Sequence, residues 1–219
     1  ISQKRSTGVY LSIFGYGFGN LRSDIMDTLA NAGNGNYYYI DSLLEAHKVF
    51  GTELGSTLNT VAKDAKAQIE FNEDYVEKYR LIGYENKQLT DEEFEDNKTD
   101  AGEIGAGHTT VCLIEVVLKE GIQINGELAK CTLRYKDPFE NDTDKEIITS
   151  CKEINDKPSN DFLFQTAVTE FALILRKSEY SGNSNIDNVI NRIIENQLIN
   201  DDYREEFLEL VQKYKQNYK

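Results

Sequence analysis

The sequence predicts an α+β protein built from three parts in order: a partial doubly wound α/β segment, an antiparallel β-sandwich-like unit and a C-terminal helical segment. Three patterns predict this order. Short apolar runs alternate with helical spacing near the N-terminus, apolar and polar residues alternate strictly in the middle, and apolar residues recur at helical spacing in the tail. We expect the parts to cover residues 1–58, 59–155 and 156–219.

The first part is predicted to alternate strand, helix, strand and helix. An apolar run over residues 9–14, with Val9 and Phe14 at its ends, stops at the glycine-rich sequence GYGFGN. Helical spacing follows over 25–32 and a second short strand over 37–40, and Ser42 with Glu45 then has the capping-box spacing that starts a helix over 42–54. The side chains that this helix is expected to bury are Leu43, Ala46, Val49 and Phe50. Such an order implies a right-handed parallel crossover.

The middle part changes to a period of two. Residues 65–71 alternate as a half-buried strand does, and 79–84 form a second strand candidate. Residues 88–107 resemble a long acidic and glycine-rich loop. The run over 109–119 is apolar on both faces, so we expect it at the centre of a sheet.

A hairpin is expected to end the middle part. Residues 129–136 alternate as a one-faced strand, and 145–152 are predicted to pair with them across the turn that contains Pro138. Two cysteines, Cys112 and Cys131, lie among strand residues and are expected to be small buried hydrophobes.

The tail is predicted to hold three amphipathic helices. Their apolar stripes cover residues 164–175, 186–194 and 203–214. Asp202 and Glu205 are the residues expected to cap the third helix.

Composition excludes several classes of protein. The chain has 219 residues, with 38 acidic and 24 basic side chains and a net charge of −14. That balance argues against binding to nucleic acid phosphates or to anionic lipid by charge, and no apolar run is long enough to span a membrane. The three cysteines, Cys112, Cys131 and Cys151, are widely spaced, so a disulfide scaffold and a zinc ribbon are excluded, and their redox state stays open.

No motif in the chain carries a defined chemistry. GYGFGN lacks the third glycine of a dinucleotide fingerprint, and AGEIGAGHTT over 101–110 lacks the lysine of a phosphate-binding loop. Both are interpreted as turns. His47 and His108 are the two histidines and belong to different segments, so each is expected as a surface or helix-face residue. We therefore predict no catalytic, cofactor-binding or metal-binding residue.

Three further features have ordinary structural interpretations. Asp142 and Asp144 resemble a fragment of a calcium loop, but the glycine and glutamate that such a loop requires are missing, so a hairpin turn is favoured. The acidic run over 91–100 is interpreted as a solvated loop. The consecutive tyrosines over 37–39 place rings on both strand faces and are expected to pack under helices, although one ring could meet a partner.

Several separated motifs resemble one family. GVYLSIFGYGFGNLRSDIMDTLANAGNGNYYYIDSLLEAHKVF is similar to the C-terminal half of a von Willebrand factor type A domain. TVAKDAKAQIEFN, YRLIGYEN and DAGEIGAGHTTV then resemble bacterial proteins that join this domain to an uncharacterised C-terminal region. The resemblance implies that residues 1–58 are the last two strand–helix units of a type A domain, with 42–54 as its final helix.

The resemblance also limits what can be expected of metal binding. Type A domains hold a divalent cation, usually magnesium, through an Asp-x-Ser-x-Ser motif and later Thr and Asp residues. These positions lie upstream of the segment that resembles the family, and the motif does not occur here. Magnesium is thus expected only in an N-terminal half of the domain that this sequence lacks.

The function expected from the resemblance is a non-catalytic protein-binding or scaffold module at the bacterial cell envelope, periplasmic or surface. Two alternatives stay open: a hydrolase that uses the 85–110 loops around Glu103 and His108, or an assembly partner of an ATPase. We also expect self-association through the exposed strand from Val9 to Phe14.

Overall fold

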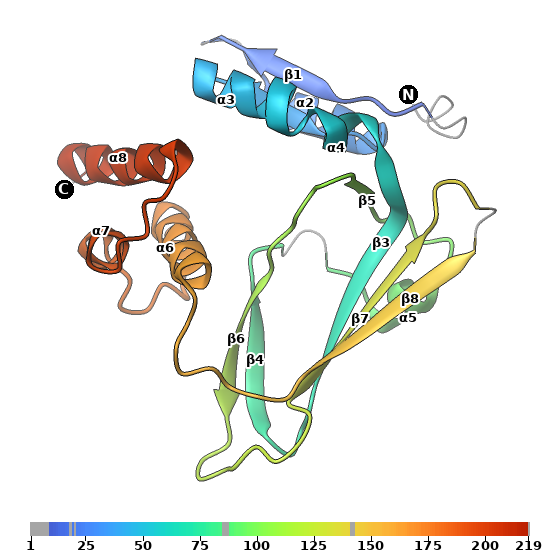
Figure 1. Ribbon diagram of the computed structural model, residues 1–219, viewed down its shortest axis with the longest axis vertical. Coiled ribbons are helices and arrows are strands. Elements are labelled where there is room, and N and C mark those ends of the chain that lie inside the picture. Colours follow the sequence, from blue (N-terminus) through green and yellow to red (C-terminus); the bar gives the residue numbers. More distant parts are fainter. Residues whose placement is uncertain (1–8, 18, 20, 85–87, 141–142, 219) are drawn as a thin grey trace. The chain divides into compact units, whose positions relative to one another are not determined.

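The computed structural model describes residues 9–17, 19, 21–84, 88–140 and 143–218. It divides the chain into two compact units, Ile1–Glu153 and Ile154–Lys219. The first unit contains the strands of the described chain, and the second contains three helices (Figure 1). The chain is thus a mixed α+β protein with several sheets, as predicted, while the three-part boundaries stay a prediction.

The first unit opens with a parallel strand pair. β1 (Ile13–Tyr16) and β2 (Tyr37–Ile40) pair in parallel from Ile13 opposite Tyr37, and α2 (Ser23–Ala32) connects them. The predicted strand–helix–strand order is confirmed. The first strand begins later than predicted, because residues 9–12 lie outside it, although the backbone N–H of Leu11 donates to the carbonyl of Gly33.

The helix predicted over 42–54 is broken into three short pieces. These are α3 (Leu43–His47), a π-helical turn η1 (Lys48–Thr52) and α4 (Leu54–Leu58). Ser42 caps α3 as predicted, because its hydroxyl accepts from the backbone N–H of Glu45. Val49 is fully buried and Ala46 is half-buried, but Leu43 is 90% exposed and Phe50 is 41% exposed, so the predicted burial of Leu43 and Phe50 is wrong. The π turn changes the rotation per residue, and the apolar positions no longer share one face.

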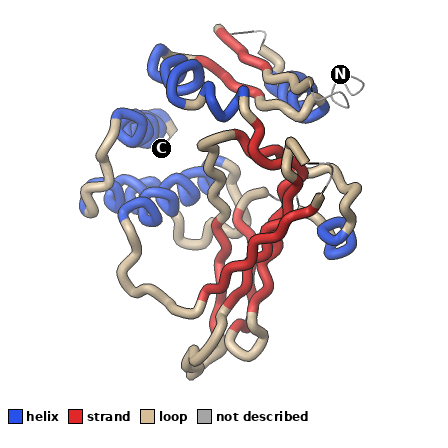
Figure 2. Tube along the Cα trace, turned by 45° about the vertical axis from the view of Figure 1, so that its right-hand side comes forward, coloured by secondary structure: helices blue, strands red, loops and turns tan. Residues whose placement is uncertain are grey.

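The larger sheet is antiparallel and has the strand order β5-β3-β7-β8. Its strands are β5 (Gly102–Gly105), β3 (Thr60–Phe71), β7 (Ala129–Lys136) and β8 (Asp144–Cys151). The hairpin of β7 and β8 is confirmed and is visible in both Figure 1 and Figure 2. Successive side chains of a strand point to opposite faces of the sheet, so the alternation of apolar and polar residues predicts a strand.

The smaller sheet is a two-stranded antiparallel ribbon of β4 (Val76–Ile82) and β6 (Leu113–Leu118). The strand predicted over 79–84 is confirmed with an earlier start. The prediction that the 109–119 run is central is wrong, since β6 pairs with β4 alone among the described strands and Val117 is exposed. An apolar run is compatible with a buried strand, but it does not determine which strands lie beside it, because these come from distant parts of the sequence.

The segment predicted as a long loop over 88–107 contains two elements. One is β5, and the other is the short helix α5 (Asp91–Glu95). Thr90 and Glu93 form a complete capping box at its start. An acidic first turn at a capped N-terminus is stabilised by the helix dipole, which explains why a charged run folds here.

The second unit consists of α6 (Asn160–Leu175), α7 (Ile186–Glu195) and α8 (Asp202–Asn217), as the three stripes predicted. The cap of α8 is Asp201, whose carboxylate accepts from the backbone N–H of Arg204, so the prediction of Asp202 and Glu205 as caps is wrong. Among the described residues, no helix combines the length and the apolar character that crossing a membrane requires.

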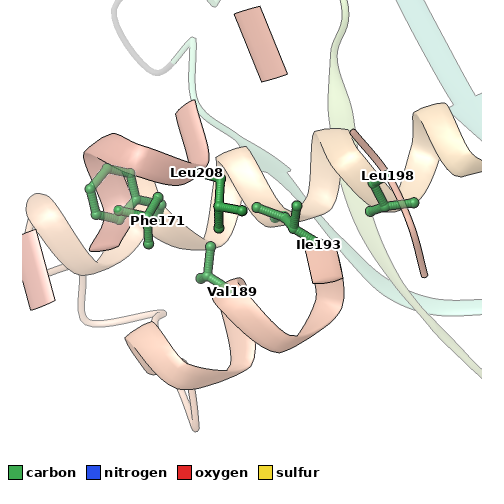
Figure 3. Packing of buried hydrophobic residues seen from close by; sticks show 7 residues of the cluster. Phe171, Val189, Ile193, Leu198 and Leu208 are labelled. Carbon is green, nitrogen blue, oxygen red and sulfur yellow. The ribbon is translucent and has the colours of Figure 1, made fainter. Parts of the chain in front are cut away.

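The helices of the second unit enclose their own core. Figure 3 shows the side chains from all three helices and the α7–α8 turn that meet in it. Two ring contacts reinforce it, since Phe171 meets Phe207 and Tyr214 edge to face at 5.8 and 5.5 Å. The buried members are Ala167, Phe171, Val189, Ile193, Leu198, Leu208 and Val211.

Candidate functional site

Three carboxylates converge where β3, β5 and the segment before β5 meet. Asp64, Asp100 and Glu103 each place a carboxylate oxygen within 4.8 Å of the other two. Asp64 and Glu103 are half-buried, whereas Asp100 is exposed. We call these three residues the acidic cluster.

A break in the register of β3 positions the first of these carboxylates. The pairing of β3 shifts between Ala62 and Ala65 toward β5, and between Lys63 and Lys66 toward β7. Asp64 lies at both shifts and adopts a φ of 49°. Aspartate tolerates this left-handed conformation better than most residues, and a bulge redirects the side chain it carries.

Polar groups from two other elements hold the cluster. The Lys136 ammonium on β7 lies 2.9 Å from the Asp64 carboxylate and also donates to the carbonyl of Asn97 at 2.8 Å. The side-chain amide of Asn34, in the turn between α2 and β2, donates to the carboxylate of Glu103. The cluster therefore connects the parallel strand pair to the larger sheet.

Burial and the repulsion by nearby carboxylates make Glu103 a weaker acid than an ordinary glutamate. Burial of the carboxyl is the main cause that raises the pKa of Glu103 from 4.5 to about 7, and the negative charges of Asp100 and Asp64 add to it. The hydrogen bond from Asn34 opposes this change. Partial burial, together with Glu103 and Asp64, also raises the pKa of the Tyr10 phenol. A carboxyl group with a pKa near neutral can take up and release a proton at physiological pH.

The cluster does not by itself indicate a metal. Carboxylate oxygens are the donors that hard divalent cations prefer. However, the Asp64 carboxylate is paired with Lys136 and accepts from the backbone N–H of Ala101 at 3.4 Å. The raised pKa of Glu103 describes a group that is protonated in part near pH 7, which weakens it as a ligand. We assign no metal to these residues.

The α5 strap, residues 90–100, approaches the cluster along the polar face of the larger sheet. Lys66 is buried and donates to the carbonyls of Glu93 and Asp96 at 3.0 and 2.5 Å. Arg134 donates to the carbonyl of Phe94 at 3.1 Å, and its guanidinium lies 5.5 Å from the centre of that buried ring. Cations near the end of a helix are favoured by its dipole, so the strap is fixed on the sheet rather than solvated as predicted.

The two histidines do not enter the acidic cluster. His47 is exposed at the end of α3, as expected. His108 is also exposed, and its ring lies 3.2 Å from the Thr110 hydroxyl. For the alternative of a hydrolase that uses the 85–110 loops, Glu103 therefore lies in the acidic cluster and His108 lies outside it. Residues 85–87 lie outside the described part of the chain.

The cysteines correct one prediction. Cys112 is exposed, contrary to the expected burial, while Cys131 is half-buried on β7 and Cys151 is exposed at the end of β8. Cys112 precedes β6 rather than lying within a covered strand, which explains the difference. Partial burial and the neighbouring Cys131 raise the pKa of the Cys112 thiol, so it is a poorer nucleophile than an ordinary cysteine.

The glycine-rich turn and the tyrosines behave largely as predicted. Gly17 and Gly19 adopt φ angles of 80° and 108° between β1 and α2, although Phe18 and Asn20 of the same motif lie outside the described residues. The three tyrosines of β2 are half-buried. Their hydroxyls are hydrogen-bonded at 3.0–3.4 Å to the Ser23 hydroxyl, the Thr57 hydroxyl and the carbonyl of Gly17.

The calcium-like fragment falls partly outside the structure. Asp142 is not among the described residues, and Asp144 begins β8. The acidic cluster, in contrast, was missed from the sequence. The one available signal was the charged pair Lys63–Asp64 inside an otherwise alternating strand.

Comparison with known proteins places the chain in a family. A family model described as "Uncharacterized protein YfbK, C-terminal" matches residues 56–124 and 119–216. The chain is 40% identical over 201 residues to Uncharacterized protein YfbK of Escherichia coli (strain K12), an alignment that covers 84% of this chain. It spans 35% of the length of that relative. The chain belongs to the YfbK C-terminal family.

Proposed function

We propose that this chain is a non-catalytic protein-binding or scaffold module. The observation that carries this proposal is a group of exposed large apolar side chains within one short segment of the first unit. In the segment that joins β2 to β3, Leu43 is 90% exposed and Leu58 is 70% exposed, and Phe50 and Val61 are exposed as well. Four large apolar side chains left in water within one short segment are typical of a surface that another protein covers.

The wider context of the proposal comes from the family resemblance. We propose that residues 1–58 are the C-terminal half of a von Willebrand factor type A domain and that the intact protein acts at the bacterial cell envelope. The parallel β1–α2–β2 arrangement supports the first part, and cell fractionation tests the second. The relative is longer than this chain, so the activity of the whole protein is part of the same proposal.

Self-association through the first strand also belongs to this proposal. β1 pairs with β2 alone among the described strands, and Val9 and Leu11 before it are exposed. A two-stranded sheet with an open edge gains stability by adding a strand. Sedimentation at increasing concentration should show association that Phe14→Lys reduces, and a monomer at all concentrations would exclude it.

Photo-cross-linking in cells tests the proposed function. A benzophenone amino acid replaces Leu43 or Leu58 in one pair of variants, and exposed Lys78 on β4 in the control. We expect discrete cross-linked protein products from the first two positions and none from the third. Equal, diffuse or absent cross-linking at all three positions would overturn the proposal.

A hydrolase remains the second candidate because Glu103 has a pKa of about 7. A general acid or base works best when its pKa lies near the working pH. A panel of p-nitrophenyl esters and phosphates tests it directly. Turnover that disappears in both Glu103→Gln and His108→Ala would establish the enzyme and displace the binding module.

A further inference from the structure

The outer edge of β8 is a long and regular strand edge. Among the described strands β8 pairs with β7 alone, in eight consecutive residue pairs from Asp144 to Cys151 without a register shift (Figure 1). It contains no proline or glycine. Proteins normally shorten, bulge or cover such edges, because the open backbone groups of a long regular edge pair with another strand.

β5, at the opposite edge of the same sheet, has features that hinder pairing with a further strand. β5 has four residues, and two of them are Gly102 and Gly105. Its pairing with β3 contains two register shifts. A short, irregular strand offers few consecutive backbone groups, so the two edges of this sheet differ in their capacity to accept a further strand.

The side chains of β8 favour a β-structured ligand. Ile147 and Ile148 are 52% and 60% exposed, and because they are neighbours they lie on opposite faces of the sheet. The half of the strand from Ile147 onward carries no charge. An added strand would cover one isoleucine on each face, and such side-chain contacts supply specificity in strand addition while main-chain hydrogen bonds supply affinity.

The charges around β8 favour a basic ligand over a second copy of this chain. The ammonium of Lys145 is paired with Asp137 and Glu140 at 2.9 and 3.2 Å. The guanidinium of Arg134 is paired with Glu95 and Glu146 at 2.9 and 3.2 Å. These two cations are thus neutralised within the chain, and Glu127 adds an exposed carboxylate beside Ser150. The exposed Lys152 that follows the strand is offset in charge by the exposed Glu153 next to it.

We infer that the edge of β8 binds an extended segment of a partner protein in which β-branched residues alternate with lysine or arginine. The inference rests on the proposed binding function and names one surface for it. Backbone hydrogen bonds to β8 supply the pairing, Ile147 and Ile148 supply apolar contacts, and the surrounding carboxylates select positive charge. The same carboxylates would repel those of a second copy at the same edge.

A peptide titration tests this inference on the full chain. The probe is a fluorescein-labelled peptide, Lys-Val-Lys-Thr-Val-Lys-Val-Thr-Lys-Val, followed by fluorescence anisotropy at 0.15 M salt. Three changes should each weaken binding at least tenfold: N-methylation of alternate backbone amides, replacement of the peptide lysines by glutamate, and the double substitution Ile147→Lys with Ile148→Lys. The matched control is Ile194→Lys on α7, at a position that is also 52% exposed, and it should bind as the wild type does.

Each alternative outcome overturns the inference. Equal binding of the N-methylated peptide excludes strand addition, and equal binding of the glutamate peptide excludes selection for positive charge. Dimerisation of the wild type that the double variant abolishes, without peptide binding, identifies a second copy as the occupant. The cross-linking positions Leu43 and Leu58 lie outside β8, so their products would preserve the binding function even if the peptide fails.

Discussion

Replacing Glu103 by glutamine should make the protein more stable at alkaline pH. A pKa raised from 4.5 to about 7 means that the folded state holds the Glu103 proton more tightly than the unfolded state does. The stability that this proton contributes is fully present below about pH 4.5 and is lost as the pH rises through about 7. Each pKa unit corresponds to about 1.4 kcal/mol, so the free energy of unfolding would change by about 3 kcal/mol in total. Because the side chain is half-buried, solvent screening reduces the expected value to about 1–2 kcal/mol.

The Glu103→Gln variant keeps the shape of the side chain and an oxygen that can accept from Asn34, and it removes the ionisation. Urea unfolding followed by tyrosine fluorescence, at pH 5 and pH 8, measures the difference. We expect the variant to be more stable by about 1–2 kcal/mol at pH 8, and by only about a quarter of that at pH 5. Glu73→Gln, at an exposed position between β3 and β4, is the control and should not change the pH dependence.

The result that would refute this reasoning is a Glu103→Gln variant with the same stability as the wild type at pH 8, or a lower one. Equal stability would show that the Glu103 carboxylate is solvated in the folded state. Lower stability would show that its charge is needed there, as it would be for an ion pair or a bound cation.

Three further substitutions test the packing and the strap. Asp64→Asn removes one negative charge near Glu103 and should lower the pKa of Glu103 only in part, because burial is the main cause of the raised pKa. Titration of Glu103 by NMR measures the pKa, and an unchanged value would contradict this prediction. Lys66→Met removes the ammonium that donates to the carbonyls of Glu93 and Asp96, although Asp96 keeps the backbone N–H of Thr99 as a donor. We expect a cost of about 1–3 kcal/mol and faster amide exchange in the strap, and unchanged exchange would show that the strap is held by other contacts. Ile193→Ala should cost about 2–4 kcal/mol in thermal unfolding because Ile193 is fully buried, whereas Ile194→Ala at the exposed neighbouring position should cost well under half of that; equal costs would contradict the assigned core.

The regular elements were predictable from the sequence because their signals are local. The alternation over β7 and β8 predicted a hairpin, and three apolar stripes predicted α6, α7 and α8. Local patterns do not determine how strands pair at long range, which is why the apolar run of β6 was wrongly placed at the centre of a sheet.

The acidic cluster and the strap could not be predicted for related reasons. The alternation over residues 65–71 predicts that Lys66 lies on the polar face of its strand. The structure shows that α5 covers Lys66 there, so its side chain is buried. The cluster depends on the register shifts around Asp64, and a bulge has no periodic signal. It also depends on a hydrogen bond from Asn34 to Glu103, which are 69 residues apart.

Amide hydrogen exchange tests the central claim of a protein-binding module most directly. The chain alone is compared with the complex that cross-linking identifies, and exchange is measured for each peptide segment. We predict at least tenfold slower exchange over residues 43–61 or 144–151 in the complex, with no change over residues 186–195 of α7. Slower exchange confined to residues 100–108, around Glu103 and His108, would contradict the claim and favour a reactive site at the acidic cluster.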